Sequence, residues 1–237
     1  MNSGMYSLAA TMVNQLNRVE VTANNLANAN TNGFKEDHVV EGSFNYYLTR
    51  AKKDDFEPTK YNTVTNTVPK IDGNFVNNEV GSVVITGNTL DFALKQPDQF
   101  FKVRTPQNKI LFTRDGGFKN SNGFLVTQDG SKVLDNNNNP IQITDGFEKR
   151  IGIVGTTFDN LQKVGDNKYE AKEDKQVKLL LNQQDNVLQG AVEKSNVNSI
   201  VAMVSLIDSQ RRLEQAQKAM RGIDDINQKL ITKLGSR

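Results

Sequence analysis

The positions of the prolines constrain this chain more than any other feature of its sequence. All five prolines lie between residues 58 and 140, so residues 1–57 and 141–237 contain none. Proline fixes its own backbone angle and removes a hydrogen-bond donor, and it therefore interrupts helices. The distribution predicts long helices at the ends of the chain and strands and turns in the middle.

The first 34 residues have the apolar spacing of an amphipathic helix. Apolar side chains recur at steps of three or four residues. They are Leu8, Met12, Leu16, Val19, Ala23 and Leu26. Asn32-Gly33 follows, a pair that tolerates the left-handed conformation found at helix ends. We therefore expect a helix over residues 1–34, with only Arg18 and Glu20 charged before Lys35.

The C-terminal region, residues 191–237, predicts a second and longer helix. A first apolar run comprises Val197, Ile200, Val204 and Ile207. A second run, after an expected phase slip near Arg211, comprises Leu213, Ala216, Met220, Ile223, Asn227, Leu230 and Leu234. The second run alternates steps of three and four, which is the spacing of a coiled-coil seam, and Asn227 is a polar residue of the kind that fixes register there.

The middle of the chain predicts β-structure. Asn-Gly and Asp-Gly pairs separate short apolar or alternating runs, and Asn122-Gly123 between two such runs predicts a hairpin. We place a β domain at residues 86–190, and residues 35–85, which have no clean period, form an extended connector. The predicted fold class is α+β, with the terminal helices paired as a coiled coil and a central, mainly antiparallel β domain.

Composition excludes several classes of function. The formal net charge is +2, which gives no electrostatic case for nucleic acid. The chain has no cysteine and a single histidine, His38, so thiolate and multi-histidine metal sites are excluded. It has no apolar run long enough to span a membrane, no start typical of a cleaved signal peptide and no phosphate-binding or dinucleotide motif. We expect no catalytic residue, no cofactor, no metal and no small-molecule substrate.

Two amphipathic helices paired with each other cannot bury all of their apolar surface. Several hundred Å² of uncovered stripe would favour association by on the order of 10 kcal/mol per chain, at roughly 25 cal/mol per Å². The sequence therefore predicts a self-assembling subunit, and a contact between unlike surfaces that does not close gives a helical filament. The expected assembly interface comprises Leu8, Met12, Leu16, Val19, Leu26, Val197, Ile200, Val204, Ile207, Leu213, Met220, Ile223 and Leu230.

Five motifs occur in order along the chain. The first, Ala23-Asn-Asn-Leu-Ala-Asn-Ala-Asn-Thr-Asn-Gly-Phe-Lys35, follows the predicted N-terminal helix. It is similar to the signature of bacterial flagellar rod and hook proteins, which also follows an N-terminal helix. The others are Thr86–Leu94, Phe112–Phe118 with Asn122–Val126, Gln189–Asn198 and Met203–Glu214. The residues that carry the family motif are Asn24, Asn25, Leu26, Asn28, Asn32, Gly33, Phe34, Ser195, Asn196 and Val197.

The resemblance implies a structural subunit of the flagellar basal-body rod, the tubular drive shaft that transmits torque. Its partners would be copies of itself, other rod proteins, the flagellar type III export apparatus and, indirectly, hook-side axial proteins. It would be exported without a cleaved signal peptide and would lie in the rod across the periplasm. Ala93–Gln96 and Arg211–Glu214 are more similar to the proximal rod type than to the distal type.

Two alternatives stand beside this prediction. Carboxylates are plentiful enough for a glycan hydrolase that acts on peptidoglycan, although no tryptophan is present to stack on a sugar. A secreted fibre or adhesin subunit with helical ends shares the assembly physics, but it does not account for the ordered motifs.

Overall fold

The structure is a computed structural model that describes residues 2–43, 69–172, 178–179 and 186–235. The chain divides into two compact units. The helical unit contains residues 1–27, 37–75 and 198–237, and the β unit contains residues 28–36 and 76–197. The predicted connector overlaps both units, and its residues 44–68 lie outside the described part of the chain.

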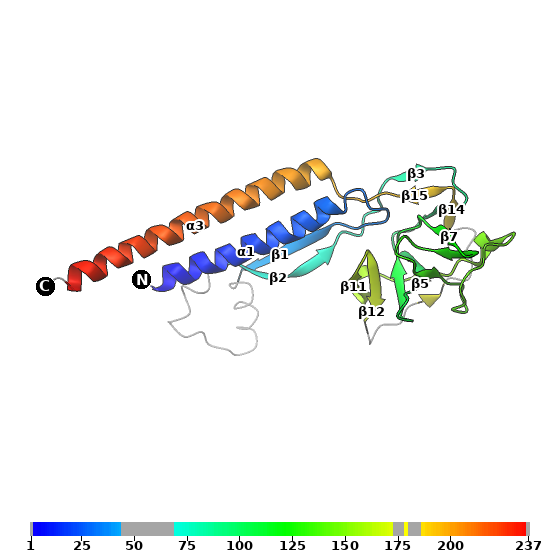
Figure 1. Ribbon diagram of the computed structural model, residues 1–237, viewed down its shortest axis with the longest axis horizontal. Coiled ribbons are helices and arrows are strands. Elements are labelled where there is room, and N and C mark those ends of the chain that lie inside the picture. Colours follow the sequence, from blue (N-terminus) through cyan, green and yellow to red (C-terminus); the bar gives the residue numbers. More distant parts are fainter. Residues whose placement is uncertain (1, 44–68, 173–177, 180–185, 236–237) are drawn as a thin grey trace. The chain divides into compact units, whose positions relative to one another are not determined.

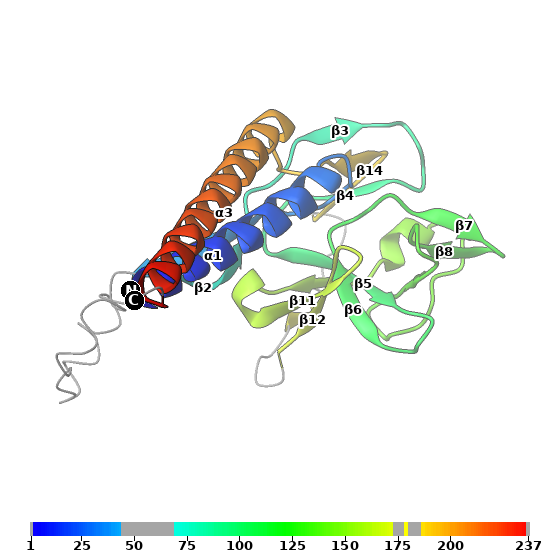
Figure 2. The ribbon, with the colours of Figure 1, turned by 60° about the vertical axis from the view of Figure 1, so that its left-hand side comes forward.

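The described part of the helical unit contains two long helices. Helix α1 spans Asn2–Ala27 and helix α3 spans Ser199–Gly235, and they lie side by side and run in opposite directions (Figures 1 and 2). A two-stranded sheet of β1 (Asp37–Ser43) and β2 (Pro69–Val76) completes the unit. The predicted helices are therefore present, and both are shorter than the sequence predicted. No helix in the described residues is long and apolar enough to cross a membrane.

Local chemistry explains both helix boundaries. The Asn198 side-chain oxygen accepts hydrogen bonds from the N–H groups of Ile200 (3.1 Å) and Val201 (3.2 Å), which is the bonding of a helix N-cap. Residues 194–197 are not helical, and Ala191–Glu193 form a strand, β15, inside the range predicted as helix. At the other boundary α1 ends before Asn28, whose carbonyl accepts the N–H of Thr31 in a turn.

The β unit is built around one large antiparallel sheet. Its main strand order is β11-β12-β6-β5-β9-β8-β7, and β10 pairs with both β5 and β13. The strands are β5 (Gln99–Arg104), β6 (Ile110–Thr113), β7 (Lys119–Ser121), β8 (Phe124–Val126), β9 (Lys132–Val133), β10 (Ile153–Gly155), β11 (Leu161–Gly165), β12 (Lys168–Ala171) and β13 (Lys178–Leu179). Two short 3-10 helices, Phe147–Arg150 and Phe158–Asn160, lie in its connections.

Two further strand pairs belong to the same unit. β3 (Val83–Ile85) pairs with β15 (Ala191–Glu193), and β4 (Phe92–Leu94) pairs with β14 (Val187–Gln189). Both pairings are antiparallel and join residues about 100 positions apart in the chain. The predicted α+β class and antiparallel central sheet are confirmed.

The sheet has a hydrophobic core on each face, and β5 contributes to both. Phe101 and Val103 belong to a core with Phe92, Leu125 and Ile153, whereas Phe100 packs with other residues. Those residues are Phe112, Val154, Leu161 and Tyr169. Successive side chains of a strand point to opposite faces, so the run Gln-Phe-Phe-Lys-Val-Arg supplies both cores.

The predicted hairpin at Asn122-Gly123 is confirmed. It joins β7 to β8, and both turn residues have positive φ angles, 52° for Asn122 and 81° for Gly123. Asparagine and glycine are the residues that this left-handed backbone accepts at least cost.

Candidate assembly site

The face of α3 that packs against its own unit carries mainly small or flexible residues. Its buried side chains are Ala202, Ser209 and Ala216, spaced by seven residues. Leu206, Leu213, Met220 and Asn227 form a second line with the same spacing, and all four are half-buried. These two lines continue along the helix without the phase slip predicted near Arg211. Ile200, Val204 and Ile207 of the early apolar run lie outside both lines.

The large apolar residues of the first turns of α3 face outward instead. Ile200, Val201, Met203, Val204 and Ile207 are between 50% and 73% exposed. Side chains of this size are usually buried in soluble proteins, and a contiguous exposed group of them is typical of an interaction surface. Further along α3, Ile226, Leu230 and Ile231 are also exposed.

Helix α1 likewise presents an uncovered line. Val13 and Leu16 are 55% and 51% exposed, and they continue a line with Ala9, Glu20 and Ala23 at alternating steps of four and three. The buried side chains of α1 are polar: Asn14, Gln15 and Asn25. The covered surface of α1 is therefore partly amide, while aliphatic residues remain outside.

The residues predicted for the assembly interface divide into two groups. Leu16, Ile200, Val204, Ile207 and Leu230 are exposed in the single chain. The half-buried group is Leu8, Met12, Val19, Leu26, Val197, Leu213, Met220 and Ile223. The first group is accessible to a partner, whereas the second already contributes to packing within the chain. Leu234 lies in α3, but its side chain is outside the described residues.

The asparagines of the first motif have different roles. Asn25 is buried and makes a pair of hydrogen bonds with the backbone of Asp37, donating to its carbonyl (2.7 Å) and accepting from its N–H (3.0 Å). Asn28 accepts the hydroxyl of Thr31 in the turn after the helix. Asn24 and Leu26 lie on α1, exposed and half-buried respectively.

The last residues of the motif are inserted into the β unit. Gly33 has a φ angle of 66°, and a Cβ placed on it would lie 2.4 Å from the backbone of Arg114. Its N–H donates to the carbonyl of Glu193 (2.7 Å), and Phe34 is buried. Only glycine fits here, because the backbone conformation and the close approach both exclude a side chain.

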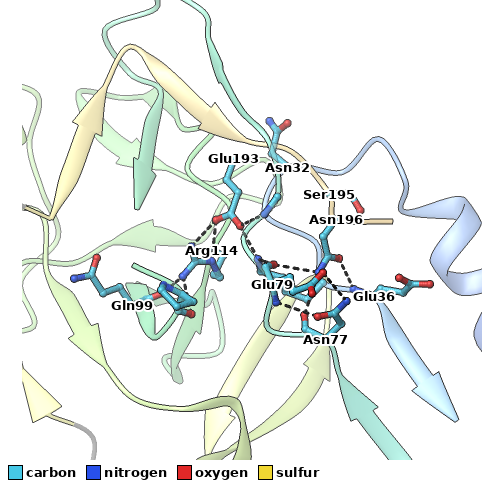
Figure 3. Close-up of polar contacts among 12 residues, drawn as sticks. Asn32, Glu36, Asn77, Glu79, Gln99, Arg114, Glu193, Ser195 and Asn196 are labelled. Atoms are coloured by element: carbon cyan, nitrogen blue, oxygen red, sulfur yellow. Dashed lines mark hydrogen bonds and ion pairs between the residues drawn. The ribbon is translucent and has the colours of Figure 1, made fainter. Parts of the chain in front are cut away.

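Glu193 is the centre of a buried charge cluster (Figure 3). One of its carboxylate oxygens accepts the ammonium of Lys35 (2.6 Å) and the N–H of Gly81 (2.9 Å). The other accepts two N–H groups of the Arg114 guanidinium (2.8 and 2.6 Å). Arg114 also donates through Nη1, its other terminal nitrogen, to the carbonyls of Gln96, Pro97 and Gln99.

Asn196 lies beside this charge cluster and forms neutral hydrogen bonds with neighbouring segments (Figure 3). Its side-chain oxygen accepts the N–H of Glu36 (2.8 Å), and its amide donates to the carbonyls of Asn77 and Glu79 (3.1 Å each). Ser195 accepts the N–H of Val197 (3.2 Å). Asn32 accepts the ammonium of Lys194 through its side chain and the amide of Asn167 through its carbonyl.

Burial shifts the pKa values of several groups in the β unit. It lowers the pKa of Lys35, although the carboxylate of Glu193 opposes this shift. It raises the pKa of Asp115 to about 6, and the nearby carboxylates of Asp129 and Asp91 add to the effect. Asp129 itself has a pKa lowered to about 2, because bonds from Lys168, Ser131 and Thr127 outweigh its burial.

The charged residues of the cluster were missed in the sequence analysis. Glu193 lies in β15, inside the range predicted as helix, and its partner strand β3 is about 100 residues away in the chain. All three residues of β15 are buried. A charge at an inward position requires a partner of opposite sign. His38 stacks on Phe75, with 5.1 Å between ring centroids. Among the described residues no group of acidic or histidine side chains is arranged to hold a metal ion.

Comparison with known proteins assigns this arrangement to a family. Three family models match: flagella basal body rod protein over residues 5–35, flagellar hook protein FlgE/F/G D1 domain over 96–157, and flagellar basal body rod FlgEFG protein C-terminal over 188–233. The chain is 32% identical to the flagellar basal-body rod protein FlgF of Rhizobium meliloti, with 99% of each chain covered. The chain belongs to the flagellar basal-body rod protein family.

Other rod proteins are similar over most of their length. FlgF of Caulobacter vibrioides is 30% identical, again with 99% of each chain covered. FlgG of Buchnera aphidicola subsp. Schizaphis graminum is 29% identical over 90% of this chain and 92% of its own. The rod protein described here is thus a structural protein of the flagellar basal body. The hydrolase and adhesin alternatives receive no support from these relatives.

Proposed function

We propose that this rod protein polymerises through the outward apolar faces of α1 and α3 into the tubular shaft that transmits torque from motor to hook. The observation that carries the proposal is the distribution of side-chain size on α3, with Ala202, Ser209 and Ala216 covered and Ile200, Val204 and Ile207 exposed. In a protein that functions as a monomer, the large apolar side chains would be covered and the small ones exposed.

The energy available from these faces is large enough to drive assembly. Covering five half-exposed aliphatic side chains contributes about 1–2 kcal/mol each, or on the order of 5–10 kcal/mol per chain, before the cost of immobilisation. The α1 and α3 faces are unlike each other, so a contact between them would repeat without closing and would generate a helical filament.

Within one chain we propose that α1 and α3 pair as a coiled coil. The seven-residue repeat of small residues on α3 supports this pairing, because it lets two helix backbones approach closely. Asn227 continues the second line of the seam and would fix the register.

The chemistry of the chain also supports export as an unfolded polypeptide through the flagellar type III apparatus, with assembly in the periplasm beside other rod proteins. It has no cysteine, so no disulfide can close a loop before or during passage. We propose that it is exported without cleavage and contacts hook-side axial proteins only indirectly.

We favour the proximal rod over the distal rod. Ala93–Gln96 and Arg211–Glu214 carry this preference, and the relatives named FlgF match over 99% of the chain. Locating a tagged copy along isolated basal bodies by immunogold labelling tests it. Label at the hook-side end of the rod would contradict the proximal assignment.

The absence of native cysteine allows a direct test of the assembly face. A single cysteine at Val204 should react with a maleimide in the monomer and become protected at least about tenfold in assembled basal bodies. A single cysteine at Asn137, in an exposed loop of the β unit, serves as a matched control for access of the reagent. Equal labelling of residue 204 before and after assembly would exclude this face.

A further inference from the structure

All places at which the chain passes between its two units lie close in sequence to one cluster of the β unit. The chain crosses four times, after residues 27, 36, 75 and 197. The segments 32–36, 77–81 and 193–196 flank these crossings, and together with Arg114 they form what we call the crossing cluster. The cluster lies entirely within the β unit.

Side chains and backbones bond the three segments to one another. Glu193 binds Lys35 of the first segment, Gly81 of the second and Arg114 of the sheet. Asn196 binds the first segment at Glu36 and the second at Asn77 and Glu79. Lys35 also donates to the carbonyl of Glu79 (2.5 Å). Each segment is therefore tied to both of the others.

The charges make this connection specific. Lys35, Arg114 and Glu193 are fully or almost fully buried, and the ion pairs between them compensate their charges. A buried ion group contributes little net stability over apolar residues, but removing one member leaves an unpaired buried charge and is costly. Such groups are well suited to define one arrangement of segments rather than to strengthen a core.

We infer that the crossing cluster is a joint, in which Glu193 and Asn196 act as positioning residues that hold together the points where the chain leaves the β unit. Its hydrogen bonds and ion pairs form only when residues 32–36, 77–81 and 193–196 are all folded in place. The joint therefore links these segments of the β unit into one cooperative element. The inference concerns the unassembled chain and does not depend on the proposed function.

Hydrogen exchange of the full-length, unassembled chain tests this directly. Five backbone amides report on the joint, because each donates to another part of it: Gly33, Glu36, Asn77, Gly81 and Asn196. Glu193→Gln keeps the shape of the side chain but leaves the two cations without a carboxylate. We expect exchange at residues 32–36, 77–81 and 193–196 to accelerate together by at least about tenfold.

A milder variant and a control keep the test decisive if Glu193→Gln fails to fold. Asn196→Ala removes three neutral hydrogen bonds without leaving a buried charge, and it should loosen the same three segments. Glu170→Gln is a matched change at an exposed pair with Lys109 and should change none of them. In Asn196→Ala, exchange in β5 and β6 should change less than twofold.

Three results would overturn the inference. They are loosening confined to the segment that carries the substitution, no loosening in either variant, and acceleration in β5 and β6 equal to that in the three segments after Asn196→Ala. The last would mean that the cluster contributes only to global stability. Because no assembly is involved, these results are independent of the cysteine-protection test of the rod interface.

Discussion

Replacing Ile200 with aspartate should separate assembly from folding. Ile200 is 73% exposed at the second position of α3, immediately after the Asn198 cap. An exposed substitution of this kind changes monomer stability by about 0.5 kcal/mol or less. A negative charge in the first turn of a helix is also favourable by about 0.3–1 kcal/mol. The isolated subunit should therefore be as stable as the wild type.

In the filament the same change should be severe. Covering the exposed part of Ile200 contributes about 2 kcal/mol, so its loss alone weakens each contact by roughly 30-fold. A carboxylate in that position must also be desolvated without a partner, which costs several kcal/mol more. Because every subunit of the shaft repeats the defect, we expect no assembled rod.

The assay has two parts. Circular dichroism and urea unfolding of the purified Ile200→Asp chain should match the wild type. Complementation of a strain that lacks its own copy should give no motility and no rod in isolated basal bodies. Ile200→Val is the control, since it keeps the apolar surface and should restore both. A motile strain with normal rods carrying Ile200→Asp would refute the assignment of this face to assembly.

Three further predictions concern the β unit. Asp115→Asn should raise the free energy of unfolding of the β unit by up to about 3 kcal/mol at pH 8 and little at pH 4. The pKa of Asp115 is about 6 in the folded chain, so its ionisation costs more folding free energy as the pH rises above the lower pKa of the unfolded chain. Urea titrations that show the same pH dependence in both proteins would contradict this. Gly33→Ala should lower the free energy of unfolding by more than about 2 kcal/mol, and Gly123→Ala by only about 1 kcal/mol. Both glycines have positive φ angles, but only a Cβ on Gly33 would clash with another part of the backbone. Equal losses of stability in thermal unfolding would be inconsistent with this packing. A fragment of residues 86–190 lacks Lys35 and Glu193 and should not unfold cooperatively in denaturant, whereas residues 28–197 should; a cooperative transition in the shorter fragment would show that the β unit does not need the charge cluster.

The two helices and the turns were predictable because their signals are local. The apolar periodicity of both helices and the left-handed turn at Asn122 depend on residues within a few positions of each other. The short strands β3 and β15 were not predictable in the same way. Their pairing joins residues 83–85 to residues 191–193, and no local pattern specifies such a partner.

The assembly face was only partly predictable for a related reason. Periodicity identifies which residues share a stripe, but it does not say which of two stripes faces the chain's own second helix. On α3 the covered stripe carries Ala202, Ser209 and Ala216 at steps of seven residues. The uncovered stripe carries Ile200, Val204 and Ile207 at steps of four and three. Larger side chains are normally assigned to the inside, and here they lie outside.

This distribution has a physical consequence for the proposed assembly. The fully buried side chains of the helix pair are small or polar, and those of α1 are Asn14, Gln15 and Asn25, while leucine and methionine side chains beside them are only half-buried. The exposed aliphatic residues would then be available to other chains. A helical unit built this way would gain further stability from neighbours, whereas the β unit has its own cores and its charge cluster. Folding of the β unit and polymerisation of the helices can therefore be separate steps, driven by different surfaces of the same chain.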